Sequence, residues 1–134
     1  MTASHDNAVH DERAAAILAR RASGLIAHDE VLAELADADC GAALAALVAE
    51  RVRLDAALVL RALEADDDQP ISVMCRAAGF RINSYSALLR MRRRQNRGTG
   101  SAPAYALTFF SDLSPASAER RVRRLTGEPA ERHT

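Results

Sequence analysis

Four arginines near the middle of the chain have the residue type and spacing to bind phosphate groups. They follow one another at i, i+3, i+4 and i+7, which places them on one face of a helix. A guanidinium group presents several N–H donors in a planar fork that matches phosphate oxygens. Binding of nucleic acid through such a stripe would weaken steeply as the salt concentration rises. The four residues are Arg90, Arg93, Arg94 and Arg97.

The segment that carries the stripe has the outline of a helix-turn-helix. A helix opened by Pro70 is expected to end near Gly79, because Pro suits the first helical turn and Gly suits the residue after the last turn. A second helix would be capped by Asn83 or Ser84 and run to about Gln95. In a DNA-binding pair, the start of this second helix enters the major groove. The residues that would then face base edges are Asn83, Ser84 and Ser86, and Arg81 would face phosphate.

The same segment is also compatible with helix packing or with protein binding. Two consecutive helices joined through a Gly occur in many helical bundles. The charge distribution offers partners for the Arg face within the chain itself. Residues 1–69 contain six Arg and fourteen Asp and Glu, a net charge of −8, whereas residues 70–134 contain twelve Arg and four acidic residues, a net charge of +8. Such asymmetry favours a charged partner, self-association or pairing between the two halves.

No other pattern in the sequence predicts catalysis or a bound cofactor. The chain lacks a dinucleotide-binding GxGxxG, a Walker loop, an HExxH pair and a GxSxG nucleophile elbow. His28 lies beside acidic residues at a predicted helix start, where helix capping explains it better than metal binding. Residues 66–68 are three Asp without the alternating spacing of a calcium loop, so we expect a solvated acidic connection. We therefore expect no enzymatic activity, no cofactor and no metal site.

The two cysteines predict core thiols. Cys40 and Cys75 lie in apolar helical stretches, without CxxC spacing or a neighbouring His. Reduced, buried thiols are typical of a cytoplasmic protein. Residues 1–12 are polar and acidic, unlike a signal peptide, and no apolar run is long enough to span a bilayer. These features favour a cytoplasmic location without a membrane partner.

Composition and periodicity predict an all-α chain. Ala and Leu, two strong helix formers, dominate the apolar residues, while Trp is absent and Phe and Tyr are few. Side chains that suit helix N-caps are Asp39, Asp55 and Ser114. Apolar stripes at helical spacing predict about eight short helices. The predicted helices lie near residues 6–21, 29–38, 40–51, 56–63, 70–78, 84–95, 105–110 and 115–125.

The 134 residues are expected to form one helical domain. Its less ordered parts would be residues 1–10, an internal linker at residues 98–103 and a flexible tail at residues 127–134. The second to fifth helices recur at roughly fifteen-residue spacing, which predicts stacked helix pairs of the HEAT or armadillo type. The repeat is degenerate, and an irregular helical bundle is the alternative.

One stretch of the chain resembles the C-terminal part of a bacterial family called domain of unknown function 2336. Its most specific feature is the Arg-Ala-Ala-Gly sequence at residues 76–79, and the resemblance extends over roughly residues 31–125. It implies a helical, HEAT-like fold with no established activity and no catalytic residues. Because members of that family are longer upstream, it also implies a short version without the N-terminal half. The residues that carry the resemblance are 70–80, 87–92, Tyr105 and 113–124.

These patterns predict a non-enzymatic helical interaction module, a scaffold or adaptor in the bacterial cytoplasm that binds an unidentified protein. The alternative is a helix-turn-helix-like regulator that binds nucleic acid through residues 70–96. Self-association through the oppositely charged halves is a third hypothesis. An Arg face paired within the chain would weaken the nucleic-acid hypothesis, and an exposed face with a protruding helix start would strengthen it. The candidate interaction surface consists of Arg81, Asn83, Ser84, Arg90, Arg93, Arg94 and Arg97.

Overall fold

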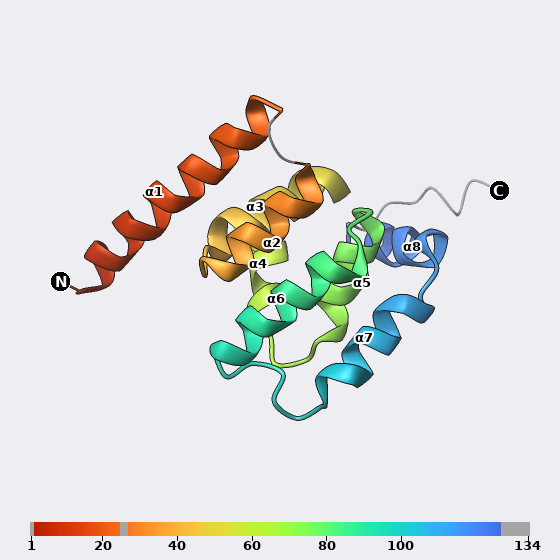
Figure 1. Cartoon of the computed structure of the whole chain (residues 1–134). Helices are drawn as coiled ribbons and strands as arrows, with labels where there is room; N and C mark the ends of the chain where they lie inside the picture. The colour runs from red at the N-terminus through yellow and green to blue at the C-terminus, as the bar shows by residue number, and fades with distance from the viewer. Residues whose placement is uncertain (1, 25–26, 127–134) are drawn as a thin grey trace.

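The computed structural model describes residues 2–24 and 27–126 (Figure 1). Within those ranges the chain forms eight α-helices and no strand, which confirms the all-α prediction. None of these helices is long and apolar enough, over the described residues, to cross a lipid bilayer. The helices are α1 (Thr2–Ala22), α2 (His28–Asp37), α3 (Gly41–Val52), α4 (Ala56–Glu64), α5 (Gln69–Ala77), α6 (Ile82–Arg94), α7 (Pro103–Asp112) and α8 (Pro115–Leu125).

Helix α1 includes much of the segment for which the sequence predicted disorder, residues 1–10. It reaches the rest of the molecule through α2, and Ala14 and Ile17 on its C-terminal half are buried. Figure 1 shows the remainder of α1 extending away from the other helices. The predicted linker, residues 98–103, connects α6 to α7. The predicted flexible tail, residues 127–134, lies outside the described residues.

The most extensive helix packing joins segments that are far apart in the sequence. Helix α2 packs on α6, and α5 packs on α8, whereas α3 and α4 stack as neighbours (Figure 1). In a solenoid, each repeat contacts only the repeats next to it. The pairs α2–α6 and α5–α8 therefore favour the irregular-bundle alternative for these stacked helices.

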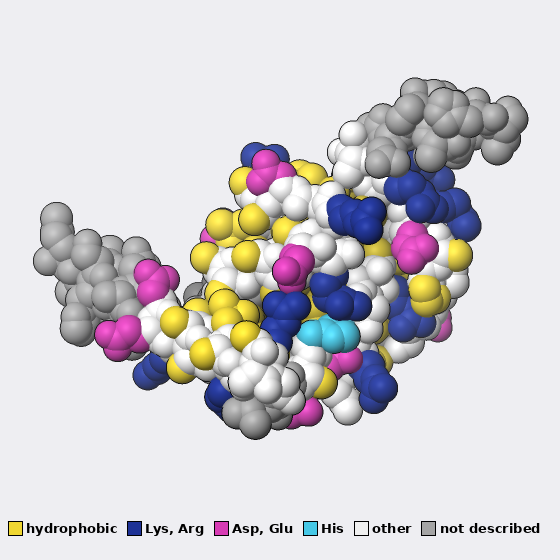
Figure 2. Space-filling view, turned by 90° about the horizontal axis from the view of Figure 1, so that it is seen from above, with side chains coloured by type: hydrophobic (Ala, Val, Ile, Leu, Met, Phe, Trp, Pro, Cys, Tyr) yellow, Lys and Arg dark blue, Asp and Glu magenta, His cyan; other side chains and the backbone are white. Residues whose placement is uncertain are grey.

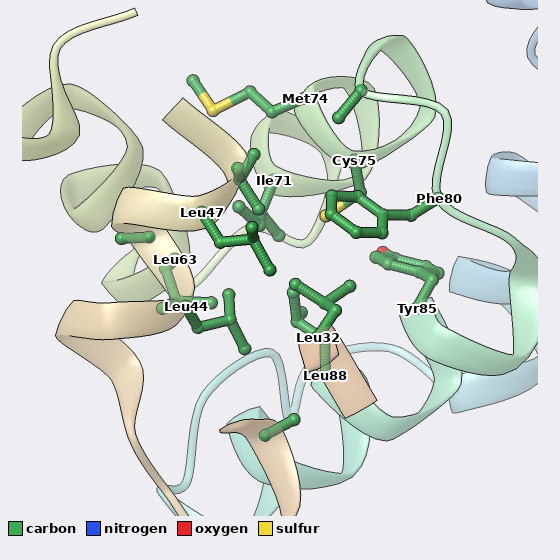
Figure 3. Packing of buried hydrophobic residues seen from close by; sticks show 14 of the residues in the cluster. Leu32, Leu44, Leu47, Leu63, Ile71, Met74, Cys75, Phe80, Tyr85 and Leu88 are labelled. Carbon is green, nitrogen blue, oxygen red and sulfur yellow. The ribbon is translucent and has the colours of Figure 1, made fainter. Parts of the chain in front are cut away.

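The core lies where α2, α3, α5 and α6 meet (Figure 3). Tyr85 of α6 stacks on Phe110 of α7 with ring centroids 4.4 Å apart, which ties α7 to this core. Full burial of one large aliphatic side chain contributes roughly 1.5–3 kcal/mol. The buried side chains labelled in Figure 3 are Leu32, Leu44, Leu47, Leu63, Ile71, Met74, Cys75, Phe80, Tyr85 and Leu88.

Cys40 and Cys75 are both buried and form no disulfide, as the sequence predicted. Burial raises the pKa of each thiol above its ordinary value. Because the thiolate is the reactive form, neither cysteine is activated as a nucleophile at neutral pH.

The predicted helix caps at Asp55 and Ser114 are confirmed. Asp55 accepts a hydrogen bond from the Ala57 amide at 3.0 Å, and the Ser114 hydroxyl accepts one from Ser117 at 3.1 Å. The prediction for Asp39 is wrong. Its φ of 57° is left-handed, so it ends α2, and Cys40 precedes the first residue of α3. Asp is among the few non-glycine residues that adopt this conformation readily, which explains its position.

Candidate functional site

The arginines of α6 lie against the acidic half of the same chain. At the exposed edge, Arg94 Nη2 is 3.1 Å from Asp39 Oδ1 and donates to the Ala36 carbonyl at 2.7 Å. Arg90 is further from its partner, with Nη2 3.9 Å from Asp37 Oδ1. Both carboxylates belong to α2 or the residues that follow it, so the packing of α2 on α6 brings these opposite charges together.

The centre of this arrangement is a buried group of three charges. The Arg92 side chain has no exposed surface and Asp68 is only 7 % exposed. Arg92 Nη2 lies 2.9 Å from one Asp68 oxygen, and Arg93 Nη2 lies 2.9 Å from the other. Arg92 also donates to the backbone carbonyls of Leu63 and Asp66. A buried guanidinium is tolerated when its donors are satisfied in this way.

Asp68 is held in its charged form by these two arginines. Burial alone would raise the pKa of the carboxyl, but hydrogen bonds from Arg93 and Arg92 outweigh burial and lower the pKa below its usual value of 3.8. The hydrogen bond to Asp68 in turn raises the pKa of Arg93. Asp68 is therefore ionised at neutral pH, and its contacts with Arg92 and Arg93 form a fixed structural link between α6 and the start of α5.

The turn that follows α6 packs against the acidic connection between α4 and α5 and donates hydrogen bonds to it. Arg97 donates to the Glu64 carbonyl, and the Gly98 amide donates to the Asp66 carboxylate at 3.3 Å. Gly98 has a φ of +68°, and a Cβ at that position would collide with Arg93 Nη1 and Asp68 Oδ1. The expectation of a fully solvated connection at residues 66–68 is therefore wrong for Asp68. The sequence shows its charge but not the two helices that enclose it.

The start of α6 is also held by an acidic residue of α2. The Arg81 amide donates to Asp29 Oδ1 at 2.8 Å, and the Ser84 hydroxyl lies 2.8 Å from the same oxygen. The predicted caps at Asn83 and Ser84 are consequently wrong. Helix α6 begins at Ile82, and the carboxylate that accepts a hydrogen bond at its start belongs to Asp29 of α2. A helix N-terminus binds anions, and here the anion is the Asp29 side chain.

The structure divides the residues predicted to face nucleic acid. Ser84 is buried against α2, whereas Asn83 is exposed and the Arg81 side chain is 87 % exposed. Ser86 is partly buried and accepts a hydrogen bond from Arg90 at 3.2 Å. The start of α6 thus packs on α2 and does not stand clear of the bundle.

A groove runs between α6 and α7, and the sequence analysis did not single it out. Its volume is 560 Å³, within the range of ligand and peptide pockets. Three apolar side chains, Leu89, Pro103 and Leu107, lie among the arginine stems. The spacing of apolar residues in the sequence cannot reveal such a groove, because the groove depends on the distance between α6 and α7. The lining residues are Ser86, Leu89, Arg90, Arg93, Arg94, Pro103 and Leu107.

Comparison with known proteins does not place this chain in a family. No family model, no curated protein and no solved structure matches this chain. The resemblance to the domain of unknown function 2336 family stays a prediction, and the functional argument rests on the geometry of the described residues.

His28 is placed as a packing residue. Its ring meets the Phe80 ring edge-on, with centroids 5.2 Å apart. Burial, followed by the nearby Arg51 charge, lowers the pKa of His28 below its ordinary value. The imidazole is therefore neutral at physiological pH, and no group of three or more potential metal ligands gathers around it or elsewhere in the described residues.

Proposed function

We propose that this chain is a non-enzymatic protein-interaction module that binds its partner in the groove between α6 and α7. The observation that carries the proposal is the apolar floor of Leu89, Leu107 and Pro103 beneath the α6 arginines. An apolar groove is the kind of surface into which an amphipathic helix lays its apolar face. The occupant that fits is an amphipathic helix with two or three aliphatic anchors and acidic residues beside them.

The fixed arginines make the rim of the groove suitable for such a helix. Arg93 is anchored on Asp68, and Arg94 is anchored on Asp39 and the Ala36 carbonyl. Each guanidinium has five N–H donors, so a carboxylate from a partner can be added to the existing contact. Because their positions are already restrained, these side chains lose little conformational entropy on binding.

Nucleic-acid binding through residues 70–96 receives less support from the same contacts. The stripe residues Arg90, Arg93 and Arg94 each have a carboxylate of this chain within 4.0 Å, and the fourth, Arg97, donates to a backbone carbonyl. The positive charge that a run of phosphates would neutralise is therefore already reduced by carboxylates of this chain. Self-association through the charged halves receives less support for the same reason, since these opposite charges are paired within one molecule.

The proposal is tested by site-specific photo-crosslinking in cells that express the full chain. A photoreactive residue at Ser86, inside the groove, should form a discrete crosslink to one partner protein. The same residue at Glu119 on α8 should not capture that partner. A peptide from the crosslinked region should then bind the purified chain in a fluorescence anisotropy titration.

A matched pair of variants on α7 separates the groove from a general charge effect. Leu107→Arg places a charge on the apolar floor and should weaken peptide binding at least tenfold, which corresponds to about 1.4 kcal/mol. Thr108→Arg adds the same charge at the exposed neighbouring position and should leave the affinity within about twofold. Equal weakening by both variants, or a crosslink that forms only at Glu119, would contradict the proposal.

A further inference from the structure

A second arginine-rich surface lies on α8. Arg120, Arg123 and Arg124 are all exposed, and no carboxylate within the described residues forms a salt bridge with any of them. Their spacing of i, i+3 and i+4 places them on one side of the helix. The opposite side of α8 buries Ala118 and Val122 against α5, which fixes the direction in which the arginines point.

The C-terminal end of α3 extends this surface. Arg51 and Arg53 line a cavity of 380 Å³ together with Arg123 of α8. Arg51 is held in place, because its Nε donates to the Ala78 carbonyl at 2.8 Å and its guanidinium carbon lies 5.8 Å from the Phe80 ring centroid. Arg53 is exposed and has no salt bridge among the described residues. Figure 2 shows arginine side chains gathered across this face of the molecule.

We define the α8 basic face as Arg51, Arg53, Arg120, Arg123 and Arg124. Glu119 is the acidic residue that lines the same cavity, so the face has a large positive excess. We propose that the α8 basic face binds the sugar–phosphate backbone of a nucleic-acid duplex, without reading its sequence. This surface differs from the groove between α6 and α7, and the inference is independent of the protein-binding proposal.

The form of the face favours a duplex backbone over the other polyanions. A membrane-surface helix needs an apolar face for the acyl chains, and α8 has turned Ala118 and Val122 toward α5. A tight protein interface needs a cluster of exposed apolar anchors, and the cavity beside Arg123 has only Val52, Ala77 and Val122 as its apolar lining. Regularly spaced phosphates match a surface in which arginines are the dominant exposed groups.

The test is fluorescence anisotropy of the full chain with a labelled mixed-sequence DNA duplex of about 20 base pairs, titrated at several salt concentrations. Binding is expected at ~1–100 μM at low salt, with a slope of log K against log salt of about −3 to −4. The double variant Arg123→Gln/Arg124→Gln should bind at least tenfold more weakly. Its salt slope should be smaller by about two, because two phosphate contacts are lost.

The matched control is Arg13→Gln/Arg61→Gln, which removes the same charge from two exposed positions, on α1 and α4, that have no salt bridge among the described residues. It should stay within about twofold of the unmodified chain in affinity and keep its salt slope. Circular dichroism of both variants confirms that the helices are intact. Equal losses in the two variants would overturn the proposal, because they would show a response to net charge alone.

Two competing polyanions give the remaining outcomes. Vesicles that contain phosphatidylglycerol would overturn the proposal in favour of a membrane if they bind the chain more tightly than the duplex does. Poly-glutamate would overturn it in favour of an acidic protein if it displaces the duplex at equal charge concentration. Absence of binding to the duplex at low salt would also overturn it. Preference for the duplex over both probes supports the proposal.

Discussion

Helices α6 and α8 are both rich in arginine, yet their arginines have opposite surroundings. On α6, Arg92 is fully buried and Arg93 shares a carboxylate with it, while Arg94 pairs with a residue of the loop after α2. On α8, the exposed arginines have no salt bridge within the described part of the chain. The apolar stripe of α8 is narrow and faces α5, whereas α6 is enclosed by α2 on one side and α7 on another.

This contrast shows that the density of arginine in a sequence does not identify a free basic surface. The deciding factor is where the acidic residues lie in the folded chain. The sequence offers fourteen acidic residues in its first half, and the fold delivers several of them to α6. The most basic run of the chain is therefore part of its internal structure, whereas the arginines of α8 form no salt bridge with any other described residue.

The largest expected difference between the two helices is in stability. Arg92→Met should lower the free energy of unfolding by about 4 kcal/mol, because it removes one partner of a buried ion pair and leaves two backbone carbonyls without a donor. The same substitution on the other helix, Arg124→Met, should change it by less than about 0.5 kcal/mol. Urea denaturation measures both. Similar values for the two variants would show that the buried charges are not a structural link.

The turn after α6 should be nearly as sensitive. Gly98→Ala would push a methyl group into the contact between Arg93 and Asp68 and would require a left-handed alanine, so we expect a loss of about 3 kcal/mol. Gly100→Ala is the control, because no atom lies within 4 Å of its Cβ position, and it should be neutral within about 0.5 kcal/mol. Thermal and urea unfolding of the pair would reveal the difference. A destabilised Gly100→Ala would point to a general intolerance of the loop.

The buried carboxylate should give the unmodified chain a characteristic response to acid. The pKa of Asp68 is lower in the folded chain than its ordinary value of 3.8. Its contribution is therefore complete above that value and is lost as the pH falls through the lower folded pKa. Asp68→Asn should cost about 2 kcal/mol at pH 7 and should lack this acid-dependent component. Unfolding free energies measured between neutral and acidic pH should converge for the two proteins, and parallel curves would contradict the assignment.

The smallest effect belongs to the exposed edge of α6. Arg94 and Asp39 are about 40 % exposed, so solvent screens their pairing. Arg94→Gln should reduce the unfolding free energy by about 0.5–1 kcal/mol at low salt and by less at high salt. Arg53→Gln removes an exposed charge that has no salt bridge among the described residues, and it should have no measurable effect on stability. A salt-independent loss for Arg94→Gln would assign its effect to the Ala36 hydrogen bond.

Local signals in the sequence predicted most of the elements. The Ala and Leu stripes located the helices. Asp55 and Ser114 were predictable as caps, because a cap of this kind needs only a short polar side chain that accepts a hydrogen bond from an amide two or three residues away. One error, at the start of α6, occurs where a distant residue takes over a local role. Asn83 and Ser84 have the chemistry of caps, but Asp29 of another helix supplies the carboxylate at the start of α6.

The candidate site was predictable only in part for the same reason. The helical spacing correctly placed Arg90, Arg93 and Arg94 on one helix, but Arg97 lies beyond the end of α6. The charge asymmetry correctly suggested internal partners as one alternative. Arg92 was not selected, because it lies off the stripe and an arginine is rarely buried. The identity of its partners depends on contacts between residues 24 to 29 positions apart, which no periodic pattern encodes.

The bond between Asp29 and the start of α6 has a consequence for synthesis on the ribosome. It joins residues 52 positions apart, and Arg94 reaches back 55 positions to Asp39. The acidic half therefore leaves the ribosome first. Its carboxylates repel one another at that stage, because the arginines that pair with them have not yet been translated. Because non-local contacts form only after the loop between them is closed, α2 cannot be secured until α6 has left the exit tunnel. Because the acidic half precedes the basic half, the contacts between α2 and α6 can form only after both halves have been synthesised as far as α6.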